Sequence, residues 1–177
     1  MKRHSVQKLV YAALCLALAI VLPFLTGQIK DFSKIFSPMH LPVMLCGLLC
    51  GWQYGLAVGL IAPILRSVCF GMPVMFPDAV CMAAELGTYG LVTGLGRRFL
   101  PKKIGWTCVT LIAAMLLGRL VLCAAKLAVA GLTNGTFALA MFFGSSVLKT
   151  VPGMILQLVL LPLILLALDK AGLTPKE

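Results

Sequence analysis

Charged residues are scarce in this sequence, and acidic residues are the scarcest. Only five Asp and Glu stand against 15 Lys and Arg; charged residues make up 11% of the 177 residues, whereas hydrophobic residues make up 61%. Soluble domains are closer to half apolar and a quarter charged, because a polar surface has to cover their core. The composition therefore excludes an ordinary soluble domain and predicts a protein that is surrounded by lipid.

Signature motifs of catalysis and of nucleotide binding are also absent. No GxxxxGK[ST], HExxH or GxSxG sequence occurs, so nothing predicts ATP hydrolysis at a P-loop or the commonest hydrolase mechanisms. The seven cysteines form no CxxC pair and no Cys/His set, and we interpret them as small apolar residues of buried helices. We therefore expect no catalytic residue, no metal site and no cofactor.

The net charge of +10 comes largely from basic residues that flank apolar runs. These residues are Lys2, Arg3 and Lys8 before the first run, Arg97, Arg98, Lys102 and Lys103 between two later runs, and Lys170 and Lys176 at the end. Basic residues beside membrane spans mark the cytoplasmic side, which predicts that both termini are cytoplasmic. No polar domain carries these charges, and the pattern argues against nucleic-acid binding.

Six apolar segments alternate with short polar connections. They cover approximately residues 7–25, 41–50, 54–70, 78–96, 104–130 and 137–168. Because about 20 apolar residues cross a bilayer as a helix, the chain is predicted to be an all-α integral membrane protein of one domain, a compact six-helix transmembrane bundle. The second segment is too short for a straight crossing, and the last is long enough for its first third to be a separate helix.

Ionisable residues inside these segments gather toward one membrane face. With both termini inside, the outer half or the centre of the membrane receives Arg66, Asp78, Glu85, Arg119, Lys126 and Lys149, the outer loops receive His40 and Asn134, and Tyr89 shares the helix face of Glu85. An isolated charge in lipid costs about 3 kcal/mol or more. This one-sided distribution predicts a substrate-binding pocket that opens to the outside.

Pairing among these residues is an alternative explanation. Glu85 with Arg119, and Asp78 with Arg66 or Lys126, would neutralise most of the set. Pairing of four basic with two acidic residues leaves about two positive charges, which a carboxylate or phosphate on a ligand could balance. We therefore predict a small, polar and anionic ligand. His40 is expected in a loop or at the rim of the pocket, and not as a base.

Small residues in the first segment indicate a helix-packing surface. Ala13 and Ala17 are four residues apart, a spacing that lets another helix approach closely. The spacing alone leaves open whether that helix belongs to this chain or to a partner. A second series of small residues, interpreted as a packing scaffold, follows in the next two segments: Gly47, Gly51, Gly55 and Gly59.

Several of these motifs occur together in one known family. Ala13-x-x-x-Ala17, the sequence PMHLPVMLCGLLCG at residues 38–51, Tyr54-Gly55 and Gly71-Met-Pro73 resemble the substrate-binding S components of energy-coupling factor (ECF) vitamin transporters. The resemblance implies capture of a vitamin near the outer surface of a bacterial-type cell membrane. It also implies docking, through Ala13 and Ala17, to a transmembrane coupling subunit that two cytoplasmic ATPases drive.

We therefore predict the high-affinity substrate-capture subunit of an ATP-driven importer for a small water-soluble vitamin or related micronutrient. The basic surplus favours pantothenate, while a pyridoxine-type, flavin or cobalamin-type ligand stays open. One alternative is a stand-alone ion-coupled carrier or channel, which the lack of polar groups in the inner half of the membrane disfavours. The other is an intramembrane enzyme that uses Glu85 or His40.

Overall fold

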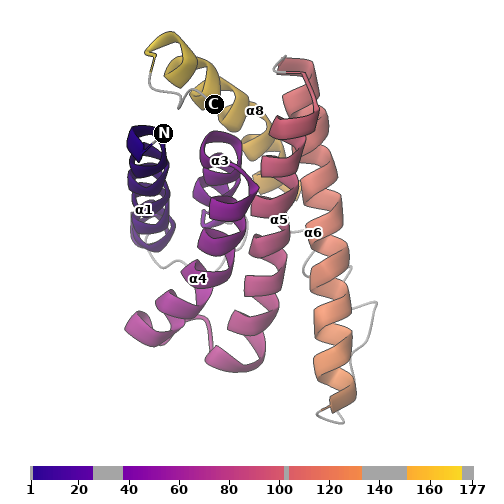
Figure 1. Cartoon of the computed structure of the whole chain (residues 1–177). Helices are drawn as coiled ribbons and strands as arrows, with labels where there is room; N and C mark the ends of the chain where they lie inside the picture. Colours follow the sequence, from indigo (N-terminus) through magenta and orange to yellow (C-terminus); the bar gives the residue numbers. More distant parts are fainter. Residues whose placement is uncertain (1, 26–37, 102–103, 133–150, 173–177) are drawn as a thin grey trace.

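The computed structural model describes residues 2–25, 38–101, 104–132 and 151–172, and within these ranges all regular structure is helical. The helices are α1 (Lys2–Leu25), α3 (His40–Cys50), α4 (Trp52–Phe70), η1 (Met75–Ala79), α5 (Val80–Phe99), α6 (Ile104–Leu132) and α8 (Val151–Lys170) (Figure 1). Five stretches in this part of the chain are long and apolar enough to cross a membrane. The predicted all-α membrane bundle is confirmed, with six α-helices in the described part of the chain.

Helix α3 lies at the centre of the bundle. It packs against α1, α4 and α5 and also contacts α8, and nearly all of its 11 residues are buried. At 1.5 Å per residue it is about 16 Å long, roughly half of the hydrocarbon core of a bilayer. A helix that is apolar on every side belongs inside other helices, and α3 therefore acts as the core around which the longer helices stand.

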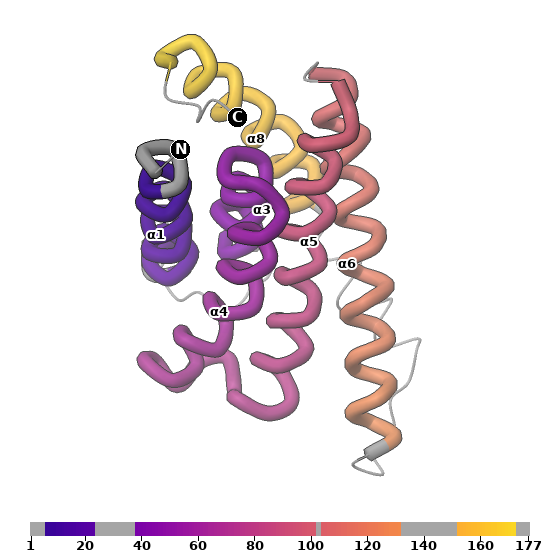
Figure 2. The backbone as a smooth tube through the Cα atoms, in the orientation of Figure 1, coloured from indigo at the N-terminus to yellow at the C-terminus, as the bar shows by residue number. Residues whose placement is uncertain are grey.

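Gly51 makes the turn between α3 and α4. Its backbone has φ 96°, a conformation that glycine adopts at little cost, and its N–H donates to the carbonyl oxygen of Gly47 at 3.1 Å. Only this residue separates the two helices, so α4 returns alongside α3. Figure 2 shows the tube reversing at the upper end of α3 and descending through α4.

Glycines let α3, α4 and α5 approach with their backbones in contact. A Cβ on Gly55 of α4 would lie 2.5 Å from the carbonyl oxygen of Gly90 on α5, and a Cβ on Gly47 of α3 would lie 2.5 Å from the same oxygen. Gly94 meets the backbone of Trp52 in the same way. The glycine series is thus a packing scaffold, as the sequence predicted, and its partner on α5 is a second series of glycines.

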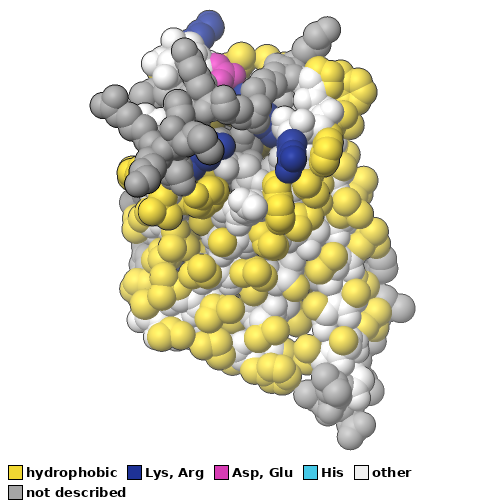
Figure 3. Space-filling view, in the orientation of Figure 1, with side chains coloured by type: hydrophobic (Ala, Val, Ile, Leu, Met, Phe, Trp, Pro, Cys, Tyr) yellow, Lys and Arg dark blue, Asp and Glu magenta, His cyan; other side chains and the backbone are white. Residues whose placement is uncertain are grey.

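Both ends of the described chain lie at one end of the bundle. In Figures 1 and 2 the start of α1, the end of α8, the end of α5 and the start of α6 lie at the top, while α6 extends beyond its neighbours at the bottom. An ion pair of 3.9 Å between Arg97 and Asp169 joins α5 to α8 at the upper end. On the face shown in Figure 3, hydrophobic side chains cover most of the surface and Lys and Arg gather near that end. This arrangement is typical of a membrane protein with its basic end in the cytoplasm.

The first prediction concerns the α4–α5 contact. Gly90→Ala would push a methyl group into the backbone of Gly55, and we expect a loss of about 1–3 kcal/mol in the free energy of unfolding. Gly105→Ala is the matched control, because a Cβ there meets nothing within 4 Å. Denaturation by SDS in mixed micelles measures both. Equal stability of the two variants would contradict the backbone contact.

Candidate functional site

Glu85 is the buried acid around which the site is built. It lies in the second turn of α5, about 8 Å along the axis from the first residue of the helix, and only 2% of it is exposed. Burying a carboxylate in apolar surroundings is costly unless charges or hydrogen bonds compensate it. Its partners therefore define the site.

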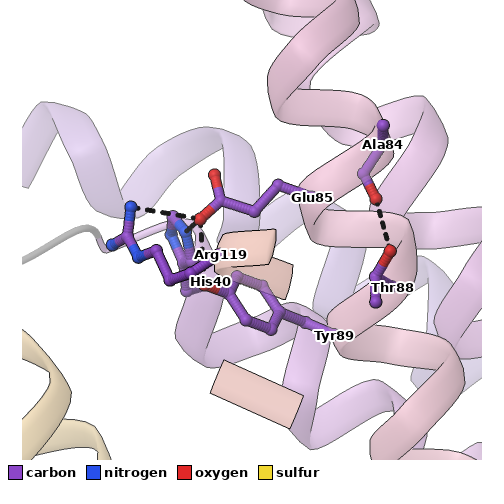
Figure 4. A network of polar contacts seen from close by, with 6 residues as sticks. All are labelled: His40, Ala84, Glu85, Thr88, Tyr89 and Arg119. Carbon is purple, nitrogen blue, oxygen red and sulfur yellow. Dashed lines mark hydrogen bonds and ion pairs between the residues drawn. The ribbon is translucent and has the colours of Figure 1, made fainter. Parts of the chain in front are cut away.

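Three side chains from three helices converge on one carboxylate oxygen of Glu85 (Figure 4). The Tyr89 hydroxyl, one turn along α5, donates to Oε1 at 2.9 Å. The Arg119 guanidinium of α6 forms an ion pair with Oε1 at 3.3 Å, and Nε2 of His40 on α3 lies 3.6 Å from it. We call His40, Glu85, Tyr89 and Arg119 the Glu85 cluster. The predicted pairing of Glu85 with Arg119 is confirmed.

His40 is the first residue of α3 and is 5% exposed, so the prediction of a loop or rim residue is wrong. Its ring centroid lies 5.0 Å from that of Tyr89, at an interplanar angle of 55°. Neither ring nitrogen of His40 makes a hydrogen bond, and the buried Nε of Arg119 makes none either. The reason for the burial is that the first turn of α3 lies inside the bundle, where His40 contacts Tyr89 and Glu85 of α5.

Gly118 positions Tyr89 and was not predicted. A Cβ on Gly118 of α6 would collide with the Tyr89 ring, so the ring occupies the space that the missing side chain leaves. Because α6 approaches so closely here, the next residue, Arg119, reaches Glu85. Gly118 could have been noticed in the sequence as a glycine in the middle of a long apolar helix. Glycine weakens a helix at such a position, which indicates that close packing requires it there.

Arg66 comes close to the Glu85 cluster from α4. It is half-buried near the outer end of that helix, and its Nη1 donates to the sulfur of Met39 at 3.3 Å. Met39 directly precedes His40, which places Arg66 beside the start of α3. Thr88, also on α5, donates to the carbonyl oxygen of Ala84 within that helix.

Asp78 and Lys126 lie further out than Glu85 and Arg119. Asp78 is exposed in η1, and no ion pair joins it to Arg66 or Lys126 in the described part of the chain, so that predicted pairing is not found. Nor does Asp78 cap α5, whose N-cap is Ala79 without a side-chain bond. Lys126 is half-buried on α6, two turns beyond Arg119. The remaining candidates, Asn134 and Lys149, lie outside the described residues.

The two faces of α1 differ in burial. Ala12, Cys15 and Ala19 belong to the core of the bundle, whereas Ala13 and Ala17 are exposed. The small residues that pack on the chain's own helices are therefore not the Ala13–Ala17 pair. That pair lies on the outer surface of α1, where another membrane helix can reach it.

The family comparison gives a single result. Residues 7–166, most of the chain, match the family described as "ECF transporter, substrate-specific component". The chain belongs to this family. No match was found among curated proteins or among solved structures.

As an ECF substrate-specific component, the chain is a multi-pass membrane protein and the substrate-capture subunit of a transporter. Its partners are a small-molecule substrate and the ECF module, and the components of this family are transport subunits and not enzymes. Within the described residues, no group of three His, Cys, Asp or Glu is arranged to hold a metal ion. The Glu85 cluster combines one carboxylate, one guanidinium, one hydroxyl and one imidazole ring, whose chemistry is that of hydrogen bonds and charge.

The second prediction tests the buried ion pair. Glu85→Gln leaves the Arg119 charge without its carboxylate, and we expect the free energy of unfolding to fall by about 3–5 kcal/mol. The double variant Glu85→Leu with Arg119→Leu removes both charges. Its loss of unfolding free energy should therefore be smaller than the sum of the losses in the Glu85→Leu and Arg119→Leu single variants. SDS denaturation measures the cycle. Asp78→Asn, at an exposed carboxylate, is the control and should change stability by no more than about 0.5 kcal/mol.

Proposed function

We propose that this substrate-specific component captures a small water-soluble vitamin or related micronutrient at the outer face of a bacterial-type cell membrane. An anionic molecule of the pantothenate type is the first candidate. The captured molecule is released inside after docking to a transmembrane coupling subunit with two cytoplasmic ATPases. The observation that carries the proposal is the Glu85 cluster, a buried polar group in a member of a substrate-binding family.

The position of the cluster supports capture from outside. His40 and Glu85 are the only Asp, Glu, Lys, Arg or His residues that are fully buried in the described part of the chain. Both lie near the beginnings of helices that run from the end opposite the termini, which we assign to the outside. Buried ionisable groups in membrane helices mark binding sites or pathways. His40 and Glu85 both lie toward the outer side. A binding protein needs buried polar groups on that side only, whereas a continuous pathway needs them across the whole membrane.

The basic residues near the cluster support an anionic substrate. Lys126 and Arg66 are half-buried at levels further out than the Glu85–Arg119 ion pair, and Asp78 is exposed. A substrate carboxylate between Arg66 and Lys126 would be attracted by both charges. Asn134 and Lys149, outside the described residues, remain further candidates for the same pocket. Arg66, Asp78 and Lys126 thus form the proposed outer part of the site, and the Glu85 cluster forms the inner part.

The third prediction concerns substrate affinity. Mass spectrometry of the small molecule that co-purifies with the protein should identify an acidic vitamin or related acid. Arg66→Ala and Lys126→Ala should each weaken its binding about tenfold, which corresponds to about 1.4 kcal/mol, measured by isothermal titration calorimetry in detergent. Arg98→Ala, at an exposed residue of the opposite end, is the matched control and should leave affinity unchanged. Unchanged affinity in both site variants would refute the anionic assignment.

The fourth prediction concerns docking. Ala13→Trp and Ala17→Trp place a large ring on the exposed face of α1, and we expect at least tenfold less uptake in proteoliposomes that contain the coupling and ATPase subunits. Substrate binding by the isolated protein should stay within about twofold, because neither residue belongs to the core.

The matched control for docking is Val159→Trp on α8, at a position 57% exposed on another helix. This variant should retain full uptake. Normal uptake in both alanine variants would refute docking through this face. Substrate uptake by the isolated protein under an ion gradient alone would instead indicate a stand-alone carrier.

A further inference from the structure

The Glu85 cluster is electrically balanced. One carboxylate, Glu85, faces one guanidinium, Arg119, at 3.3 Å, and the Tyr89 hydroxyl is a neutral donor. A further charge of either sign at this depth would be left without a counter-charge in apolar surroundings, which is costly. A carboxylate of the substrate is therefore better bound further out than against this cluster.

The neighbours of His40 determine which of its nitrogens carries the proton. Nε2 faces Oε1 of Glu85 at 3.6 Å, so a proton on Nε2 is attracted, whereas a lone pair there would be repelled. In the tautomer with the proton on Nε2, Nδ1 of the ring is a hydrogen-bond acceptor.

Some hydrogen-bonding capacity of the cluster is unused. His40 Nδ1 and Arg119 Nε are buried without a hydrogen-bond partner, although nearly all buried polar atoms in proteins have one. In Figure 4 the second carboxylate oxygen of Glu85 points away from the three contacts on Oε1. The cluster therefore has acceptors on His40 and Glu85 and a donor on Arg119 that a bound molecule can satisfy.

We propose that His40, Glu85 and Arg119 bind the inner end of the substrate, and that this end is an uncharged group with both a hydrogen-bond donor and an acceptor. A hydroxyl, a primary amide or a ring lactam has this chemistry. The inference rests on the proposed function and gives the substrate a direction: the uncharged polar end enters first, and the acidic group stays near Arg66 and Lys126. A molecule that lacks these groups would leave buried polar atoms of the inner site unpaired. The cost of those unpaired atoms makes the inner site selective.

The first experiment reads the state of His40 without any substrate. The chain has two histidines, so His4→Gln leaves His40 as the single signal in ¹⁵N-histidine NMR of the full chain in nanodiscs. The tautomer with the proton on Nε2 and a bare Nδ1 is expected. An imidazolium, or a neutral ring with the proton on Nδ1, would overturn the proposal.

The second experiment uses acids paired with uncharged analogues: pantothenate with panthenol, nicotinate with nicotinamide, and biotin with biotin amide. In the pair that binds, His40→Phe should weaken the binding of both compounds by the same factor of ten or more, and His40→Gln should weaken their binding less. Arg66→Ala should weaken the acid alone. A His40→Phe effect confined to the acid would overturn the proposal. Absence of binding by all pairs would count against the proposed vitamin substrates, while the NMR result still decides the state of His40.

Discussion

The ion pair between Glu85 and Arg119 is the interaction on which the site depends. A carboxylate that is 2% exposed inside an apolar bundle is tolerated because a guanidinium lies 3.3 Å away and a tyrosine hydroxyl 2.9 Å away. These contacts require α5 and α6 to lie close together, and Gly118 provides the room by accepting the Tyr89 ring where a side chain would stand. A small residue that contacts no ligand thus determines the distance between the two charges. The same contact fixes the orientation of Tyr89 and, through it, the surroundings of His40.

Backbone contacts along the inner part of the bundle have a complementary role. Gly47, Gly55 and Gly90 bring α3, α4 and α5 together over the half of the bundle that lies toward the termini. Lipid provides little hydrophobic driving force between helices, so close van der Waals packing is a main source of their association. Among the described residues, the buried polar side chains of the tightly packed end are hydroxyls and an amide, whereas the opposite end carries the buried charges. One half of the bundle therefore supplies stability, and the other half can be given over to binding.

Sequence reasoning gave the helical segments and the Glu85–Arg119 pair, because hydropathy marks the segments and depth places these two charges at one level. It failed at His40, which follows Pro38 and Met39 in what reads as a loop, because only the packing of α3 inside the bundle buries it. Asp78 was expected in an ion pair, but it lies exposed in η1 and forms none with the described residues. Gly118 was overlooked because its importance depends on a tyrosine 29 positions earlier, and no local pattern reveals that contact.

In the proposed site, the Glu85 cluster and the basic residues further out would act on a substrate in different ways. Cations at the outer level would act at a distance and raise the rate at which an anionic solute arrives, but they would discriminate little among acids. The inner cluster would act through hydrogen bonds of fixed direction, whose loss leaves buried atoms unpaired. Affinity for acids in general and selectivity for one of them would thus come from different residues. Because the inner cluster joins α3, α5 and α6, a substrate bound there also connects three helices, and its arrival is coupled directly to the packing of the bundle.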